Sequence, residues 1–294
     1  MTIQEAITEY LIVQQMRGNS FQTIRYYRES LKRFTDYTGE DYILQMVTMQ
    51  TLRGYYLFLS NRNLSSNSIQ TYVRALRAFL HWCYDEEYIF VNLFDKFRLP
   101  KAQKKAVDVL TDTEVSRLLG CFNLRYLPHL RNACICSLML DSGFRLHEVV
   151  TLTLDHLHIP EGYAIVDGKG NKQRLVPLGL YTRRLLSRYL HRRPGCVDTD
   201  FVFLMSDFRP ITDNTLRQMF QKLKRRADIP RLHAHLLRHT FATRYLENGG
   251  DMYALQQILG HTSLDMVKRY VHSSTRRLVP RYSDYSPLDN LMFR

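Results

Sequence analysis

Four segments in the carboxyl-terminal two thirds of the chain carry polar residues whose types and spacing could do chemistry. They are DSGFRLHEV with Arg145, DGKGNK with Lys169, HAHLLRHTFAT with His235 and Arg238, and LGHTSLDMVKRY with His261 and Tyr270. Arginine and lysine bind phosphate oxygens, histidine exchanges protons near neutral pH, and tyrosine can serve as a nucleophile. Together these residues would suit cleavage of a phosphodiester, whereas any one of them is also compatible with an ordinary structural role.

The first two segments each have a simple structural alternative. Arg145 opens an expected helix three residues before Glu148, so the two could form an ordinary helical ion pair. Lys169 lies at the tip of an expected hairpin between Gly168 and Gly170, where a lysine is often merely solvated. The two glycines would nevertheless allow close approach of a partner, and a tip with several cations favours a nucleic-acid groove. These cations are Lys169, Lys172 and Arg174.

In the third segment, His235 and Arg238 are three residues apart and share one face of an expected helix. An arginine beside a histidine near a helix start suits a phosphate, because the helix amino terminus adds favourable partial charge. A zinc site formed by His233, His235 and His239 is the alternative. It is disfavoured because no glutamate separates the last two histidines and no nearby cysteine or acid completes the set.

The fourth segment is expected to fold as helix, turn and helix, with His261 in the turn and Tyr270 nine residues later on the second helix. Tyrosine is abundant, at 19 of 294 residues, and both residue types are often partly buried with a satisfied polar tip. Core packing is therefore the alternative for this pair. A nucleophilic tyrosine needs help to lose its proton, because its ordinary pKa is near 10.

Helices must position these residues, and the first hundred residues contain one helical spacing twice. Ile24, Tyr27, Leu31 and Phe34 follow the same steps of three, four and three as a later set, which consists of Ile69, Tyr72, Leu76 and Phe79. Such steps mark one apolar helix face, and a serine four residues before each set is a candidate amino-terminal cap. These caps are Ser20 and Ser65. With further helices over 2–16 and 48–61, residues 1–100 are predicted to form a small helical bundle.

A polar, basic stretch at 101–110 is predicted to be a linker, and a second domain follows over 111–280. Its pattern is mainly helical, and YAIVDGKGNKQRLVPLG is a hairpin signal, because residues that favour strands lie on both sides of a glycine- and asparagine-rich centre. The expected helices are 112–121, 128–141, 180–192, 212–227, 234–247, 251–258 and 264–272. The fold class is therefore mainly α with a small antiparallel β-hairpin.

Charge and cysteine content limit the classes of function. The formal net charge is +13, and residues 101–294 hold most of the excess, with 30 basic and 18 acidic side chains against 11 and 10 in residues 1–100. A polyanionic partner is thus expected. Five cysteines without a CxxC pair favour neither a disulfide framework nor a zinc ribbon, and the sequence shows neither a basic leader nor a long apolar run. A cytoplasmic, nucleoid-associated protein without a membrane partner is expected.

The order of the four segments resembles the conserved boxes of the tyrosine recombinases, the phage-integrase and Xer-type site-specific recombinases. The resemblance covers roughly residues 108–280, and the preceding bundle resembles the core-binding domain of that family. It implies a catalytic set in which Tyr270 is the nucleophile. The other five members are Arg145, Lys169, His235, Arg238 and His261.

The roles that follow are expectations. The two arginines would clamp the phosphate, His235 would accept the Tyr270 proton, and Lys169 would protonate the leaving 5′-oxygen. His261 would donate to a phosphate oxygen, and Glu148 would orient Arg145. Lys172 is the alternative to Lys169. Neither a cofactor nor a metal is expected, because the arginines supply the positive charge.

The resemblance also implies a C-shaped, two-domain clamp around double-stranded DNA and a homotetramer on two DNA sites. The tail 281–294 would dock on a neighbouring subunit, and six basic residues are candidate DNA contacts. They are Arg25, Arg28, Arg74, Arg77, Lys172 and Arg174, although a solvated helix face explains the first four equally well. The chain begins directly with the bundle, which favours an Xer-like chromosome resolvase or a small mobile-element recombinase over a phage integrase with distant arm sites.

Two other functions are compatible with the charge. A DNA-binding or architectural protein would keep the clamp without the chemistry, but it would have no need of the six-residue set. An RNA-binding protein would rest on charge alone. If Tyr270 is not the nucleophile, Tyr282 and Tyr285 are the nearest substitutes.

Overall fold

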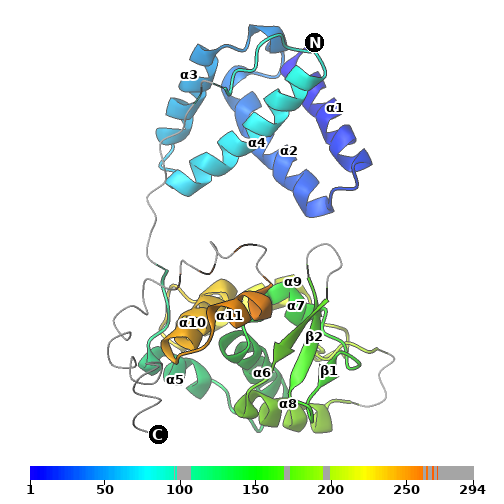
Figure 1. Cartoon of the computed structure of the whole chain (residues 1–294), viewed down its shortest axis with the longest axis vertical. Coiled ribbons are helices and arrows are strands. Elements are labelled where there is room, and N and C mark those ends of the chain that lie inside the picture. The colour runs from blue at the N-terminus through cyan, green and yellow to red at the C-terminus, as the bar shows by residue number, and fades with distance from the viewer. Residues whose placement is uncertain are drawn as a thin grey trace, which may run out of the picture. The chain divides into compact units, whose positions relative to one another are not determined.

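The computed structural model describes residues 1–95, 97, 107–168, 173–194 and 199–260, together with residues 263, 267 and 270. The chain divides into two compact units, Met1–Lys105 and Ala106–Arg294 (Figure 1). Each unit has its own hydrophobic core. The division falls within the stretch for which the sequence predicts a linker.

The first unit consists of helices. They are α1 (Ile3–Met16), α2 (Phe21–Thr38), the short 3₁₀ helix η1 (Leu44–Met46), α3 (Met49–Ser60) and α4 (Ser66–Asp85). Both predicted serine caps are confirmed. The Ser20 hydroxyl accepts a hydrogen bond from the Thr23 backbone N–H at 3.3 Å, and that of Ser65 accepts one from Ser68 at 3.1 Å. These bonds satisfy amide groups that the first helical turn leaves unpaired.

The repeated spacing of three, four and three faces the core of this unit, as predicted. Leu31 and Phe34 of α2 and Leu76 and Phe79 of α4 are fully buried. The Phe79 ring meets that of Tyr10 edge to face, with centroids 5.5 Å apart. Aromatic and aliphatic side chains from three helices thus close one core.

The second unit begins with α5 (Asp112–Gly120), α6 (Leu127–Asp141) and α7 (Leu146–Val150). The sheet follows, with β1 (Leu157–His158), β2 (Tyr163–Asp167) and β3 (Gln173–Pro177). The remaining helices of the described residues are α8 (Leu180–Arg192), α9 (Asp213–Arg226), α10 (Ala234–Glu247) and α11 (Met252–Leu259). The predicted helices over 112–259 are confirmed to within a few residues, whereas most of 264–272 lies outside the described residues.

The sheet is antiparallel, in the order β1-β2-β3. The predicted hairpin is β2 and β3, in which Val166 pairs with Arg174 and Ala164 with Val176. The two-residue strand β1 was not predicted, because it is too short to show an alternating pattern. The fold is therefore mainly helical with one small antiparallel sheet, in line with the predicted class.

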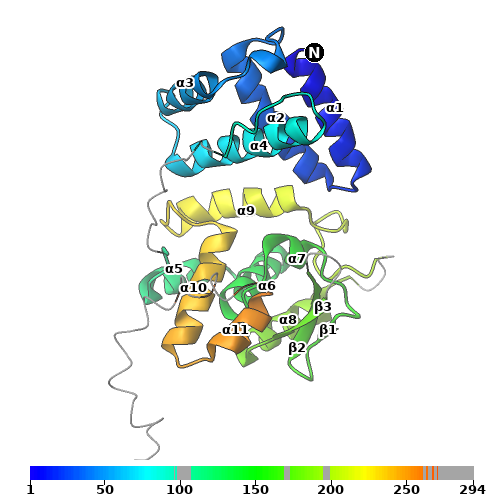
Figure 2. The same cartoon turned by 45° about the horizontal axis from the view of Figure 1, so that its top comes forward.

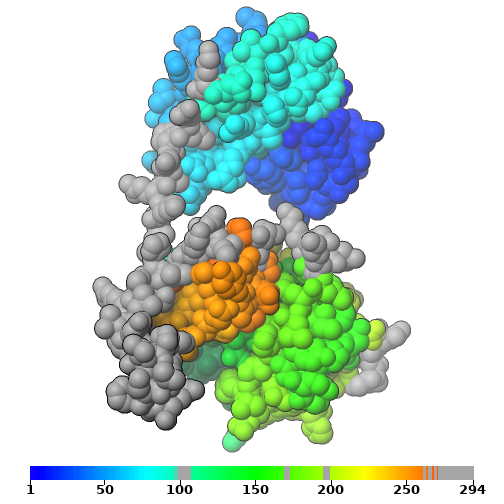
Figure 3. Space-filling model, in the orientation of Figure 1, coloured from blue at the N-terminus to red at the C-terminus, as the bar shows by residue number. Residues whose placement is uncertain are grey.

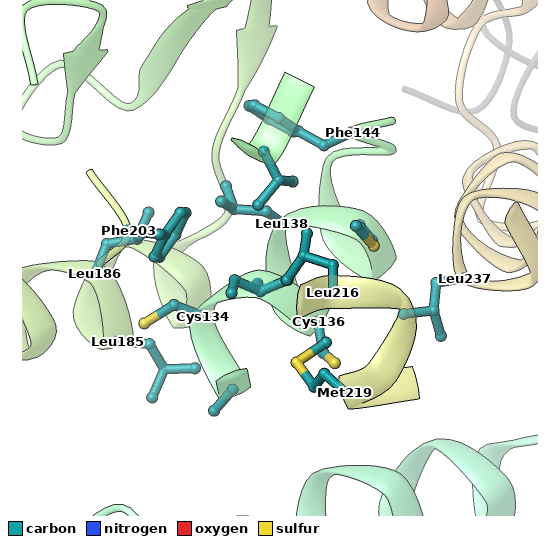
Figure 4. Close-up of a cluster of buried hydrophobic side chains, with 14 of the residues drawn as sticks. Cys134, Cys136, Leu138, Phe144, Leu185, Leu186, Phe203, Leu216, Met219 and Leu237 are labelled. Carbon is teal, nitrogen blue, oxygen red and sulfur yellow. The ribbon is translucent and has the colours of Figure 1, made fainter. Parts of the chain in front are cut away.

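Helix α6 forms the centre of the second unit and packs against both α8 and α10 (Figure 2). Its side chains Cys134, Cys136 and Leu138 are fully buried, with Phe203 and Leu216 from other parts of the chain packed around the helix (Figure 4). This apolar centre joins α6 to the helices packed around it. Within the described residues, no helix is both long and apolar enough to cross a membrane.

Candidate active site

The carboxyl-terminal end of α11 gathers three arginines. The helix ends at Gly260 in the left-handed conformation, with φ 61° and ψ 48°, where its last carbonyl oxygens have no partner within the helix. Three consecutive carbonyls accept arginine hydrogen bonds instead, namely Ile258 from Arg174 Nε at 2.8 Å, Leu259 from Arg238 Nη2 at 2.6 Å and Gly260 from Arg145 Nη2 at 3.3 Å. Cations also suit this helix end because the helix dipole is negative there.

Arg238 is the most deeply buried of the three, with 4% of its surface exposed. Its second guanidinium nitrogen, Nη1, donates to the Gly143 carbonyl. Gly143 has φ 68°, and a Cβ there would lie 2.5 Å from the Phe241 ring, so the DSG turn needs glycine to come this close to α10. Burial, followed by the positive charge of Arg145, lowers the pKa of Arg238 to about 9, which still leaves it protonated at neutral pH.

Glu148 on α7 joins two of these arginines. Its carboxylate accepts hydrogen bonds from Arg145 Nη1 and the Arg145 backbone N–H, each at 2.7 Å, and from Arg174 Nη2 at 2.8 Å. The side chain is only 5% exposed. Burial alone would raise the pKa of Glu148, but the bonds from Arg174 and Arg145 outweigh it and hold the pKa below the ordinary value. The predicted pairing of Glu148 with Arg145 is confirmed, and the buried Glu148 carboxylate holds both Arg145 and Arg174 in place.

Arg174 lies differently from the predicted DNA contact at the hairpin tip. Its side chain is 11% exposed and is held by Glu148 and the Ile258 carbonyl. On β3 it faces the same side of the sheet as the buried Val176, toward α11, and the surfaces of α11 and the strands adjoin in Figure 3. Its bonds to Glu148 and to the Ile258 carbonyl link β3 to α7 and to the end of α11, so Arg174 supports the site.

Tyr270 is buried beside α10, with 4% of its surface exposed. Its ring belongs to a small apolar cluster with Phe241, Leu255 and Leu259. Its hydroxyl oxygen lies 2.8 Å from Nδ1 of His239. Tyr270 is therefore packed against α10, and a histidine of that helix contacts its hydroxyl oxygen.

His235 lies one turn before His239, with ring centroids 6.4 Å apart. It keeps an exposed surface, yet partial burial lowers the pKa of its imidazole, and the positive charges of Arg238, His233 and Arg145 lower it further. His235 thus lies among the cations that would hold a phosphate, whereas His239 touches the tyrosine. The sequence raised His239 only as a zinc ligand, although its spacing of four from His235 places it on the same helix face.

The described histidines do not support the zinc alternative. His233 Nδ1 donates to the Arg231 carbonyl at 2.7 Å, and His239 Nδ1 contacts the Tyr270 hydroxyl. Among the residues that the structure describes, no three His, Cys, Asp or Glu side chains are grouped in a way that could hold a metal ion. These histidine nitrogens therefore point to different partners.

Three of the predicted catalytic and hairpin residues lie outside the described residues. They are Lys169, Lys172 and His261, and the same is true of Tyr282, Tyr285 and the tail 281–294. The site as described consequently contains Arg145, His235, Arg238 and Tyr270 of the predicted set. Gly260, which immediately precedes His261, receives the Arg145 bond.

In the first unit, the four arginines proposed as DNA contacts are exposed but do not share one groove. Arg25 lines a depression of about 550 Å³ between α2 and α4, which Tyr26 bridges by donating to the Thr71 carbonyl at 3.0 Å. Arg28 lines a separate groove between α1 and α2. Two neighbouring arginines on one helix thus face different surfaces.

The two α4 arginines, Arg74 and Arg77, line neither of these two depressions. Arg74 lies close enough to Tyr26 for its charge to affect the pKa of that phenol, which burial raises and the neighbouring Tyr27 raises further. Its guanidinium donates to the Gln70 side chain at 3.4 Å. Arg77 is an exposed residue of the same helix. Of the four, Arg25 lines the depression between α2 and α4, and Arg74 lies near Tyr26, which also lines it.

Comparison with known proteins gives the family. Residues 108–277 match the phage integrase family, and residues 5–99 match the phage integrase SAM-like domain. The chain is 31% identical to the tyrosine recombinase XerD of Staphylococcus aureus, over 97% of this chain and 99% of that protein. The match covers both units.

Solved structures share the fold. A Tn1549 transposon integrase in complex with a circular intermediate DNA has a TM-score of 0.78 at 21% identity, covering 96% of this chain and 99% of that one. A lambda integrase dimer bound to a core site has a TM-score of 0.76 at 18% identity, covering 94% and 97%. With the family match over most of its length, the chain belongs to the phage integrase family and is a tyrosine-type site-specific recombinase.

Proposed function

We propose that this recombinase cleaves and rejoins double-stranded DNA through a covalent 3′-phosphotyrosine at Tyr270. The observation that carries the proposal is the meeting of Arg145 and Arg238 at one helix end, beside a docked tyrosine. The two guanidinium groups bind adjacent carbonyls, Gly260 and Leu259, so two permanently charged side chains lie at the same helix end. A purely DNA-binding protein gains nothing from a tyrosine oriented in this way.

The arginine pair supplies what phosphate cleavage needs. The transition state places additional negative charge on the non-bridging oxygens, and fixed cationic donors stabilise it where it develops. Burial and the positive charge of Arg145 lower the pKa of Arg238, and a bound phosphate would offset this because its negative charge favours the protonated guanidinium. The protein itself provides the positive charge, and the proposed reaction therefore requires neither a metal ion nor a high-energy cofactor.

The covalent step conserves the energy of the phosphodiester. The Tyr270 oxygen forms a bond to phosphorus as the bond from phosphorus to the 5′-oxygen breaks, and a free 5′-hydroxyl results. Lys169 would protonate that oxygen and His261 would donate to the phosphate. Attack by another strand's 5′-hydroxyl then reverses the step, which exchanges strands without hydrolysis.

Formation of a covalent adduct tests this proposal. The probe is a pool of DNA duplexes with random sequence on both sides of a single nick, since cleavage near a nick releases a short fragment and traps the intermediate. Wild-type protein should retain a subset of duplexes through a denaturing wash, in the presence of a chelator as well as in its absence. Tyr270→Phe should retain none, whereas Tyr253→Phe, an exposed tyrosine on α11, should behave as wild type.

Two results would contradict the proposal. An adduct that persists undiminished in Tyr270→Phe would show that another residue is the nucleophile. Duplex binding by wild-type protein without any adduct would favour the second candidate, a catalytically silent DNA-binding protein.

The proposal extends to assembly. A homotetramer on two DNA sites would bring four copies of Tyr270 together, and the tail 281–294 would link neighbouring subunits. Removing that tail should leave single-site binding intact and abolish recombination between two selected sites on one plasmid. Equal recombination with and without the tail would contradict this part of the proposal.

A further inference from the structure

We propose that His239, rather than His235, is the base that accepts the Tyr270 proton. This inference rests on the function proposed above and identifies a further catalytic residue in the same site. The observation behind it is the contact between His239 Nδ1 and the Tyr270 hydroxyl oxygen, at 2.8 Å. A base must lie within hydrogen-bonding reach of the proton that it removes, and this distance satisfies that requirement.

The surroundings hold the two groups in this arrangement. The Tyr270 ring packs into the apolar cluster with Phe241 and Leu259, and its centroid lies 5.7 Å from that of His239. His239 is half-buried on α10, directly after the buried Arg238. Both the phenol and the imidazole are therefore fixed by packing, which limits the rearrangement needed before proton transfer.

The chemistry is balanced within the site. A neutral imidazole with its proton on Nε2 accepts the phenolic proton at Nδ1, while the Tyr270 oxygen forms its bond to phosphorus and the 5′-oxygen leaves. The resulting imidazolium returns the proton to Tyr270 when a 5′-hydroxyl later attacks the phosphotyrosine. The Arg238 guanidinium lies close enough to interact electrostatically with an ionised Tyr270, so it favours the phenolate as the proton departs.

His235 is less suited to this task. Its ring lies among three positively charged or titratable groups, His233, Arg238 and Arg145, and this setting weakens it as a base. The same position suits a donor to the phosphate. The two α10 histidines, one turn apart, would thus divide two roles, with His235 toward the phosphate and His239 toward the nucleophile.

The test compares substitutions at His239 on a nicked duplex that wild-type protein has been shown to cleave. His239→Asn retains an amide near the position of Nδ1 but cannot take up a proton, and we expect adduct formation about 10²- to 10⁴-fold slower. His239→Ala should be equally slow and should regain activity when imidazole is added, which shows that the protein is folded and lacks only the base. His191→Asn, at an exposed histidine on α8, is the matched control and should keep the wild-type rate.

A second probe separates the base from the acid. Replacing the bridging 5′-oxygen by sulfur gives a leaving group that needs no proton, so Lys169→Met should recover on this duplex while His239→Asn stays slow. Full recovery of His239→Asn would place His239 at the leaving group and overturn the inference. A wild-type rate of adduct formation for His239→Asn would overturn the inference as well. So would a faster rate, because it would show that the hydrogen bond from His239 holds Tyr270 back from the phosphate. In each of these cases wild-type cleavage leaves the proposed function intact, whereas failure of wild-type protein to form an adduct would reject the function itself.

Discussion

Replacing Glu148 by glutamine should weaken both the fold and the chemistry of the second unit. The carboxylate is 5% exposed and accepts three hydrogen bonds, two from Arg145 and one from Arg174. An amide has one oxygen, so its NH₂ group must face an N–H donor and at least one guanidinium bond is lost. The same change also leaves two arginines without their shared negative charge.

The expected magnitude follows from this burial. Removing one partner of a buried ion pair costs about 3–5 kcal/mol, because the remaining charge is left without compensation. For a unit of this size, 1 kcal/mol lowers the Tm by about 2–4 °C, so the Tm should fall by roughly 6–20 °C. Displacement of Arg145 should also slow adduct formation by about 10²-fold per folded molecule.

Glu114→Gln is the matched control for this experiment. Glu114 also accepts the N–H of a helix cap, from Thr111 at 2.9 Å, and a bidentate arginine, Arg231, but it lies on α5 away from the arginine pair. Calorimetry gives the Tm of each variant, and the nicked duplex gives the rate of adduct formation at a temperature where both are folded. The reasoning is refuted if Glu148→Gln keeps the wild-type Tm, or if its folded fraction reacts as fast as Glu114→Gln.

Three further results are expected. Arg238→Lys keeps the charge but loses the fork that binds the Gly143 and Leu259 carbonyls, so adduct formation should fall by about 10²- to 10³-fold, and an unchanged rate would contradict the clamp. Gly260→Ala should lower the free energy of unfolding, measured with urea, by more than the roughly 1–2 kcal/mol expected for the strained backbone alone, because the new Cβ would lie 3.0 Å from Arg174. Gly18→Ala is the control for the backbone cost, since Gly18 has φ 72° and open space around it. Equal losses in the two variants would contradict the close contact. Acid should destabilise the unit through Glu114, because the side-chain bonds from Arg231 and the backbone bond of Thr111 lower its pKa to about 2. The stabilisation by ionised Glu114 is present above its ordinary pKa near 4.5 and is lost as the pH falls toward 2. Over that pH range the free energy of unfolding should therefore decrease less for Glu114→Gln than for wild-type protein. An identical decrease in the two proteins would contradict this role of Glu114.

The sequence predicted the helices well because their signals are local. The serine caps at Ser20 and Ser65 and the apolar spacing beginning at Ile24 and Ile69 are fixed by neighbours within a few residues. The strand β1 shows the opposite case. Its two residues, Leu157 and His158, pair with β2 because the chain between β1 and β2 turns back. A strand of two residues is too short to show a periodic pattern.

The role of Arg174 could not be predicted because it depends on residues far away in the chain. The sequence places Arg174 with Lys169 and Lys172 among the cations of the hairpin tip, which are expected to face a partner. In the structure Leu175 is 54% exposed, whereas Arg174 is turned toward α11. The bonds to Glu148 and the Ile258 carbonyl, 26 and 84 residues away, outweigh the preference of each side chain taken alone.

The candidate site shows the same division. Residue types and spacing indicated Arg145, His235, Arg238 and Tyr270 and their resemblance to a recombinase. Which histidine contacts Tyr270 depends on where the Tyr270 side chain packs against α10, and the spacing within HAHLLRHTFAT cannot predict that position. The spacing of three from Arg238 singles out His235, whereas the contact of His239 with Tyr270 depends on tertiary packing.

Identification of the residue bonded to DNA tests the central claim most directly. Wild-type protein trapped on its selected nicked duplex would be digested with protease and nuclease, and the modified peptide sequenced by mass spectrometry. We predict a nucleotide phosphate on the Tyr270 hydroxyl, in the peptide that contains MVKRY. A nucleotide on Tyr282, Tyr285 or any other residue would contradict the account.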